Sequence, residues 1–302
     1  MTALLFGILT LALVGPIPEA LARAEWPLYA PRAALTLWQA ITLAAVLSAF
    51  STGFAVVSGL LRARPGDLGP VPLAASLLIL LAILVIGLRL IVTVATIGVR
   101  TRSRRRHHRE MVDLLDRTDL RHRAGADIRV LDVPAPMAYC LPGLRARVVL
   151  SEGVLTRLSA EEIAAVIAHE RAHLRARHDL VLEAFLALHA AFPRWVRSAS
   201  ALTAVRLLIE ALADDQAVRA TDRTSVGRAL VACAGASAPR GAMALGGPTT
   251  LARLRRLTFQ PTTADTHRLA ATAYLLATAL LVVPTLAVAL PWLTELNQLR
   301  GR

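Results

Sequence analysis

Four long apolar segments constrain this chain more than any other feature of its sequence. They cover residues 2–17, 33–61, 70–99 and 269–293, and Arg89 is the one charged side chain within them. A helix of about 20 apolar residues can cross the hydrocarbon core of a bilayer. We therefore expect four transmembrane helices. The composition agrees, since only 18% of the residues are charged, against about 25% in a soluble domain. Arg89 is expected to extend its charged end toward the membrane interface.

The apolar segments divide the chain into four parts. We predict an N-terminal membrane region with three transmembrane helices over 1–99, a globular domain over 100–268, a fourth transmembrane helix over 269–293 and a short tail over 294–302. Arginines cluster at both ends of the globular segment, and the formal net charge is +13. Positively charged loops stay on the cytoplasmic side of a membrane. We therefore expect a multi-pass protein of the cell membrane, with the globular domain in the cytoplasm and both termini outside.

The most basic run reads RTRSRRRHHR over residues 100–109. We interpret it as a signal that fixes the orientation of the third span. A nucleic-acid surface would need aromatic or base-reading side chains nearby, and none is visible, so we expect no direct contact with nucleic acid. Whether the first segment is removed as a signal peptide stays open. The segment lacks the early Arg or Lys of a signal peptide, whereas Ala20-Leu21-Ala22 resembles a cleavage site.

The globular segment begins with strand-like runs and continues with helical ones. Residues 128–133 and 145–150 are predicted strands, and the short run between Pro136 and Pro142 is predicted to be an edge strand. The residues of this edge strand are Met137, Ala138, Tyr139 and Cys140. Helices are predicted over 160–177, 179–192, 198–219 and 225–236. The segment is therefore expected to fold as an α+β domain.

The motif that carries chemistry is HERAH at residues 169–173, an HExxH motif. Residues four apart lie on one face of a helix, so His169 and His173 can bind the same metal ion. Glu170 then lies beside that face, where it can take a proton from a water on the metal. A helix is favoured here because Ser159 and Glu162 form an S-x-x-E capping box in front of it. We predict a Zn²⁺ site with His169 and His173 as ligands and Glu170 as the catalytic base.

A catalytic zinc site needs a third protein ligand and one open position. Glu210 is a lone acidic residue in an apolar helical stretch, where an unpaired charge would be costly. Asp214 follows one turn later on the same face. We predict Glu210 as the third ligand and Asp214 as the partner that orients a metal-binding histidine. The alternative, a helix whose acids face water, would be preferred without the HExxH motif.

Other candidates for chemistry are weaker. His178 and His189 are interpreted as structural or surface residues. Cys140 and Cys233 lack the spacing of metal ligands and are interpreted as small, inert hydrophobic residues.

Together these motifs resemble the gluzincin membrane peptidases. The resemblance rests on MAYCLPG at 137–143, VVLSEGVL at 148–155, LSAEE at 158–162, HERAH, and Glu210 with Asp214. The sequence is most similar to the M56 family of signal-transducing proteases (the BlaR1/MecR1 type) and is related in motif to the M48 family (the HtpX/Ste24 type). Three spans before the domain and one after fit M56 better, as does Ala172, where M48 members usually carry Gly. The fold class implied is a mainly α membrane protein with four transmembrane helices and an α+β gluzincin-type metalloprotease domain inserted between the third and fourth.

The resemblance also implies an activity and a partner. It implies a zinc metalloendopeptidase whose edge strand pairs with an extended substrate. The implied substrate is a cytoplasmic winged-helix repressor of the BlaI/MecI kind, cleaved during signal transduction. Only about ten residues follow the last span where BlaR1/MecR1-type proteins continue into a penicillin-binding domain, so no direct β-lactam binding is expected. Two alternatives remain: a membrane-protein quality-control protease of the M48 kind, and a non-catalytic membrane receptor with a vestigial metal site.

Overall fold

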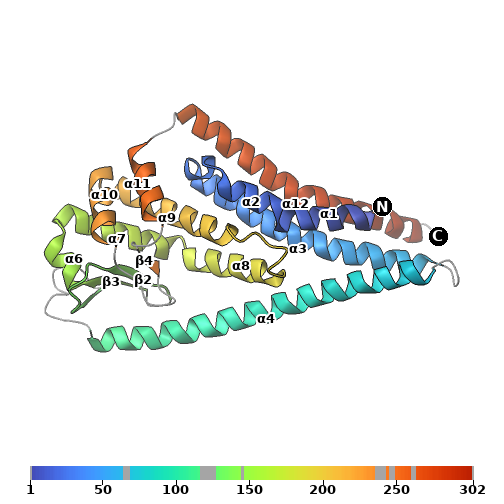
Figure 1. Ribbon diagram of the computed structural model, residues 1–302, viewed down its shortest axis with the longest axis horizontal. Coiled ribbons are helices and arrows are strands. Elements are labelled where there is room, and N and C mark those ends of the chain that lie inside the picture. The colour runs from blue at the N-terminus through green and yellow to red at the C-terminus, as the bar shows by residue number, and fades with distance from the viewer. Residues whose placement is uncertain are drawn as a thin grey trace. The chain divides into compact units, whose positions relative to one another are not determined.

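The computed structural model describes residues 2–63, 69–115, 127–143, 146–234, 243–244, 249–259 and 263–300, and they are mostly helical (Figure 1). They form two compact units that are interleaved along the chain. Unit 1 comprises Met1–Ala95, Ala184–Ala204 and Ala264–Arg302, and unit 2 comprises Thr96–Glu183 and Val205–Thr263. The prediction of one continuous domain over 100–268 therefore differs from this division, because residues 184–204 belong to unit 1.

Among the described residues, four helices are long and apolar enough to cross a membrane. Their ranges are Thr2–Arg23, Pro31–Arg62, Pro70–Val112 and Ala264–Leu286. The first joins α1 (Thr2–Val14) and α2 (Pro16–Arg23), the second is α3 (Pro31–Arg62), the third lies in α4 (Pro70–Leu115) and the fourth in α12 (Thr263–Arg300). The structure thus agrees with the four predicted spans, although α4 and α12 extend well beyond them.

Helix α3 forms the centre of unit 1. Its buried face contains many small residues, among them Ala34, Ala44 and Ala45, and small residues allow neighbouring helix backbones to approach closely. Leu13 and Val14 of α1, and Ala273 and Ala277 of α12, belong to the same core. Most large apolar side chains of α4 before residue 100 are exposed, as expected of a helix that faces lipid.

Arg89 has a fixed partner that the sequence does not reveal. Its Nε donates to the carbonyl oxygen of Ala191 at 3.1 Å, and its Nη2 donates to that of Ala190 at 3.0 Å. These are the last residues of α8 (His178–Ala191), where carbonyl groups lack helical partners. Arg89 therefore caps the end of a helix, a role that the sequence does not reveal.

Unit 2 contains a small mixed sheet. Its strands are β1 (Ile128–Leu131), β2 (Ala138–Leu141), β3 (Arg147–Ser151) and β4 (Met243–Ala244), in the order β1-β3-β2-β4. Strand β1 is parallel to β3, whereas β2 is antiparallel to both β3 and β4. The three longer strands fall within three residues of the predicted ones.

Each face of this sheet packs against a helix of unit 2. On one face, side chains such as Ile128, Val148 and Leu150 share a core with Ala165 and Val166 of α7 (Ala160–Arg175). On the other face, Tyr139, Leu141 and Val149 pack with Val112 near the end of α4. The remaining elements of unit 2 are α6 (Glu152–Arg157), α10 (Arg223–Ala232), α11 (Thr250–Thr258) and much of α9 (Ala201–Ala220).

The prediction of an edge strand over residues 137–140 is wrong for its last two residues. Tyr139 pairs with Ala244 and Cys140 with Met243, so β2 has a neighbour on both sides there. The partner is two residues long and lies about 100 positions away in sequence, too short to give a strand pattern of its own.

Candidate metal centre

Helix α7 carries the HExxH residues and begins at a well-formed cap. The Oγ of Ser159 accepts from the backbone N–H of Glu162 at 3.3 Å, and the Glu162 carboxylate accepts from the backbone N–H of Ser159 at 3.0 Å. This reciprocal pair is the predicted capping box. Since α7 packs against the sheet, His169, Glu170 and His173 are all buried.

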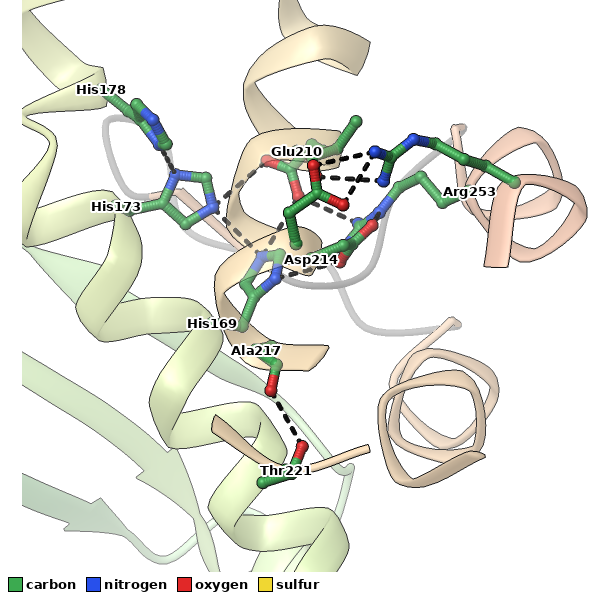
Figure 2. Close-up of polar contacts among 11 residues, drawn as sticks. His169, His173, His178, Glu210, Asp214, Ala217, Thr221 and Arg253 are labelled. Atoms are coloured by element: carbon green, nitrogen blue, oxygen red, sulfur yellow. Dashed lines mark hydrogen bonds and ion pairs between the residues drawn. The ribbon is translucent and has the colours of Figure 1, made fainter. Parts of the chain in front are cut away.

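Helix α9 brings the predicted third ligand to the two histidines (Figure 2). The Nε2 atoms of His169 and His173 lie 3.1 Å apart. The Glu210 carboxylate lies 3.4 Å from Nε2 of His169 and 3.7 Å from Nε2 of His173. Ligand atoms about 2.0–2.1 Å from a tetrahedral zinc are separated from one another by about 3.3–3.4 Å. The three residues therefore lie close enough together to bind one metal ion.

Asp214 contacts the second ring nitrogen of His169 and also has another partner. Its Oδ1 is 3.1 Å from Nδ1 of His169. The guanidinium group of Arg253, from α11, donates to both Asp214 oxygens at 2.6 and 2.8 Å and lies 2.9 Å from Glu210. Burial raises the pKa of Asp214, but the bonds from Arg253 and His169 outweigh it and hold that pKa well below its usual value.

Glu170 is in a different environment from the other two acids. It is fully buried, and no nitrogen or oxygen donor among the described residues pairs with either carboxylate oxygen. Burial is the main reason that the pKa of Glu170 rises to about 7, while His169 opposes the shift and Glu210 adds to it. The thiol of Cys140, on β2, lies next to this carboxylate and lowers its pKa slightly. A carboxylate with a pKa near 7 is well matched to general-base chemistry at neutral pH.

The charges of the buried groups fit a divalent cation. The guanidinium group of Arg253 contacts two carboxylates, those of Glu210 and Asp214, which leaves one negative charge in excess, and Glu170 adds a second when it is ionised. In the metal-free site this excess appears in the pKa of His169: burial lowers it, yet the Asp214 and Glu210 carboxylates outweigh burial and raise it to about 9. Two imidazoles and a carboxylate also form a donor set that zinc prefers.

His178 belongs to this site, although the sequence suggested a structural or surface residue. It is buried, and its Nδ1 lies 3.0 Å from Nδ1 of His173 in a hydrogen bond (Figure 2). Burial is the main cause that lowers the pKa of His178 to about 4. His189, by contrast, lies in unit 1, where its ring stacks on Phe185.

Arg253 is the other residue of the site that sequence reasoning missed. It lies in the arginine-rich segment before the fourth span, which was interpreted only through its positive charge, yet only 1% of Arg253 is exposed. Arg256 is paired as well, with Asp215 at 2.7 Å. A weak signal was available: α11 reads TLARLRRLT, and its Arg253 shares a helical face with Leu257, which belongs to the core.

Comparison with known proteins identifies the domain. The sequence profile of peptidase family M48 matches residues 101–260, just over half of the 302-residue chain. No curated protein and no solved structure gives a match. The match does not confirm the M56 assignment suggested by the motifs, and its range includes every residue of the site. This chain therefore belongs to peptidase family M48, a family of metallopeptidases.

Proposed function

We propose that this protein is a membrane-bound, zinc-dependent endopeptidase with Glu170 as its catalytic base. The observation that carries the proposal is one arrangement in unit 2. Three ligand atoms, from His169, His173 and Glu210, lie within 4.8 Å of one another. The buried carboxylate of Glu170, on the same helix as the two histidines, has no nitrogen or oxygen partner among the described residues. A site that only held a structural metal would not need that buried acid.

The residues of the site divide the work of peptide hydrolysis. Zinc, when bound, supplies Lewis acidity that polarises the scissile carbonyl and makes a water molecule easier to deprotonate. Glu170 accepts the proton of the attacking water and delivers it to the nitrogen of the leaving amine. In the metal-free site, burial raises the pKa of Glu170 to about 7, so its surroundings favour a carboxyl group that can take up a proton.

Arg253 and Asp214 keep the ligands in place without touching the substrate. Arg253 contacts Glu210 on one side and Asp214 on the other, so it sets the distance between these two carboxylates. The Asp214 carboxylate lies 3.1 Å from Nδ1 of His169, where its charge favours a proton on that nitrogen and so leaves Nε2 of the ring for the metal.

Strand β2 is the proposed contact for an extended substrate. It contacts α7, and Cys140 lies next to Glu170, so a peptide paired with β2 would run past the catalytic base. Strand β4 occupies the same pairing positions at Tyr139 and Cys140. A substrate strand would therefore have to replace β4.

The test compares three substitutions of acidic residues in the full chain, purified in detergent, with an unfolded protein as substrate. Glu170→Gln should lose about 10²–10⁴-fold in rate while keeping zinc, since Gln cannot accept the proton. Glu210→Gln should lose zinc first. The matched control is Glu161→Gln, an exposed position on the same helix, which should keep both. Wild-type cleavage by Glu170→Gln would exclude Glu170 as the base and favour a receptor with a vestigial metal site.

We propose that the peptidase unit faces the cytoplasm and lies between the third and fourth spans of a cell-membrane protein. The exposed arginines of α4 near residue 102, together with Arg255 and Arg268, support this orientation. Arg253 contributes less, since it is buried in the site. Arg255→Cys provides a probe, because both native cysteines are buried. Labelling of this variant by an impermeant reagent in intact cells would overturn the orientation.

The narrower proposal is that the substrate is a cytoplasmic winged-helix repressor, cleaved during signalling. It is supported only by the resemblance of the motifs and the order of spans to the M56 family. The test is co-expression with a small winged-helix repressor encoded next to the gene. Cleavage that depends on Glu170 supports the proposal. Cleavage of misfolded membrane proteins with the repressor left intact would replace it with a quality-control role.

A further inference from the structure

The direction in which each histidine ring can bind metal is set by its other nitrogen. Nε2 of His169 and Nε2 of His173 face each other and the Glu210 carboxylate. A neutral imidazole carries one proton, so a ring that binds metal through Nε2 must carry its proton on Nδ1. The groups that contact these two Nδ1 atoms therefore select the metal-binding tautomer.

The two Nδ1 atoms have different partners. At His169 the partner is the Asp214 carboxylate, 3.1 Å away. At His173 the partner is Nδ1 of His178, 3.0 Å away, with the two rings nearly perpendicular at 80°. His178 is only 4% exposed and His173 only 1%, so water does not readily replace this bond.

We propose that His178 is a positioning residue of the metal centre: its Nδ1 accepts the Nδ1–H of His173 and so holds the Nε2 lone pair of His173 toward the metal. This inference rests on the proposed zinc site. The opposite arrangement, in which His178 donates, would put the proton of His173 on Nε2 and block metal binding. Zinc binding therefore requires His178 to be the acceptor.

The contact depends on the break between α7 and α8. In a continuous helix, residues five apart point about 140° away from each other. Here α7 ends at Arg175, α8 begins at His178, and Arg177 between them has a left-handed backbone with φ of 49°. This turn interrupts the helical spacing, and the imidazole of His178 lies against that of His173.

Three substitutions at one position test the hydrogen bond itself. In Asn, Oδ1 takes nearly the place of the histidine Nδ1, whereas in Gln the terminal group takes the place of Nε2. We expect His178→Leu and His178→Gln to weaken zinc binding by about 10–100-fold, and His178→Asn to recover most of the affinity. The readout is zinc affinity of the full chain in detergent by chelator competition, with the Co²⁺ absorption spectrum reporting the geometry of the ligands.

A merely structural role predicts a different pattern. All three variants would then lower the melting temperature of the metal-free protein alike, and zinc affinity would not follow the Asn-versus-Gln order. That pattern, or a Leu variant with wild-type zinc affinity, overturns the inference. If wild type itself binds no zinc, the proposed function fails instead.

A measurement on the wild-type chain keeps the inference testable even if the variants do not fold. In zinc-loaded protein with ¹⁵N-labelled histidine, NMR should show Nδ1 of His173 protonated and Nδ1 of His178 unprotonated. Protonated Nδ1 on His178 would overturn the proposal.

Discussion

Removal of the Arg253 charge should destabilise unit 2 far more than an ordinary arginine substitution. In Arg253→Met, the side chain keeps most of its apolar volume, but the buried carboxylate of Asp214 and the partly exposed carboxylate of Glu210 lose their contacts at 2.6–2.9 Å. Loss of one partner from a buried ion pair costs about 3–5 kcal/mol, because the remaining charge stays buried and uncompensated. For a unit of this size, such a loss lowers the melting temperature by roughly 6–20 °C.

The chain contains a convenient reporter for this measurement. All four tryptophans lie in unit 1, so their fluorescence does not report on the site. The two cysteines, Cys140 and Cys233, both lie in unit 2 and are each 1% exposed. A thiol-reactive fluorogenic dye therefore detects the unfolding of unit 2 directly, in detergent and without engineered cysteines.

The control and the metal dependence make the prediction specific. Arg255→Met removes an exposed arginine from the same helix. This change should alter the free energy of unfolding of unit 2 by less than about 0.5 kcal/mol. The loss in Arg253→Met should be smaller with zinc than with chelator, since a divalent cation offsets part of the unpaired charge. A transition within about 2 °C of wild type in both conditions would refute the view that Arg253 balances a buried negative cluster.

Three further predictions concern the same unit. Zinc uptake at pH 8 should release about one proton, because the metal-free pKa of His169 is about 9 and a metal ligand must be deprotonated. Calorimetry in buffers of different ionisation enthalpy measures the number of protons released, and a value of zero would contradict the prediction. Ala244→Pro removes a backbone donor from β4 and so weakens its pairing with β2. If β4 competes with the substrate for β2, the KM for an extended peptide should be lower in Ala244→Pro than in the control Ala244→Gly. An unchanged KM argues against competition. Ser159→Ala should cost about 1 kcal/mol by loss of the α7 cap, seen as a lower transition in the thiol assay; no change would mean that the cap contributes little.

Much of the site was accessible from local patterns. The HExxH spacing and the capping box are properties of a single helix, and the structure shows that helix with its cap. Glu210 and Asp214 could be assigned to the same site as the HExxH residues, because a lone acid in an apolar helix needs a partner. The four spans were equally accessible, since length and hydropathy alone define a candidate transmembrane helix.

The parts that sequence reasoning missed depend on contacts between distant segments. Arg253 lies 39 residues after Asp214 and looked like one of several basic residues before a span. Arg89 looked like an isolated charge in a span until the end of α8 was seen beside it. The pairing of β4 with β2 involves two residues far along the chain, and so residues 137–140 were wrongly predicted to be an edge strand.

The sequence by itself determined where helices can cross a membrane and which residues can bind a metal, because helical periodicity and hydropathy act over a few turns. Only the tertiary structure decided which groups balance and orient those ligands. His178 shows the reason most clearly. Its place beside His173 follows from one left-handed residue at the α7–α8 turn, and a hydrogen bond of this kind requires two atoms to meet within about 3 Å, which no pattern along the chain specifies.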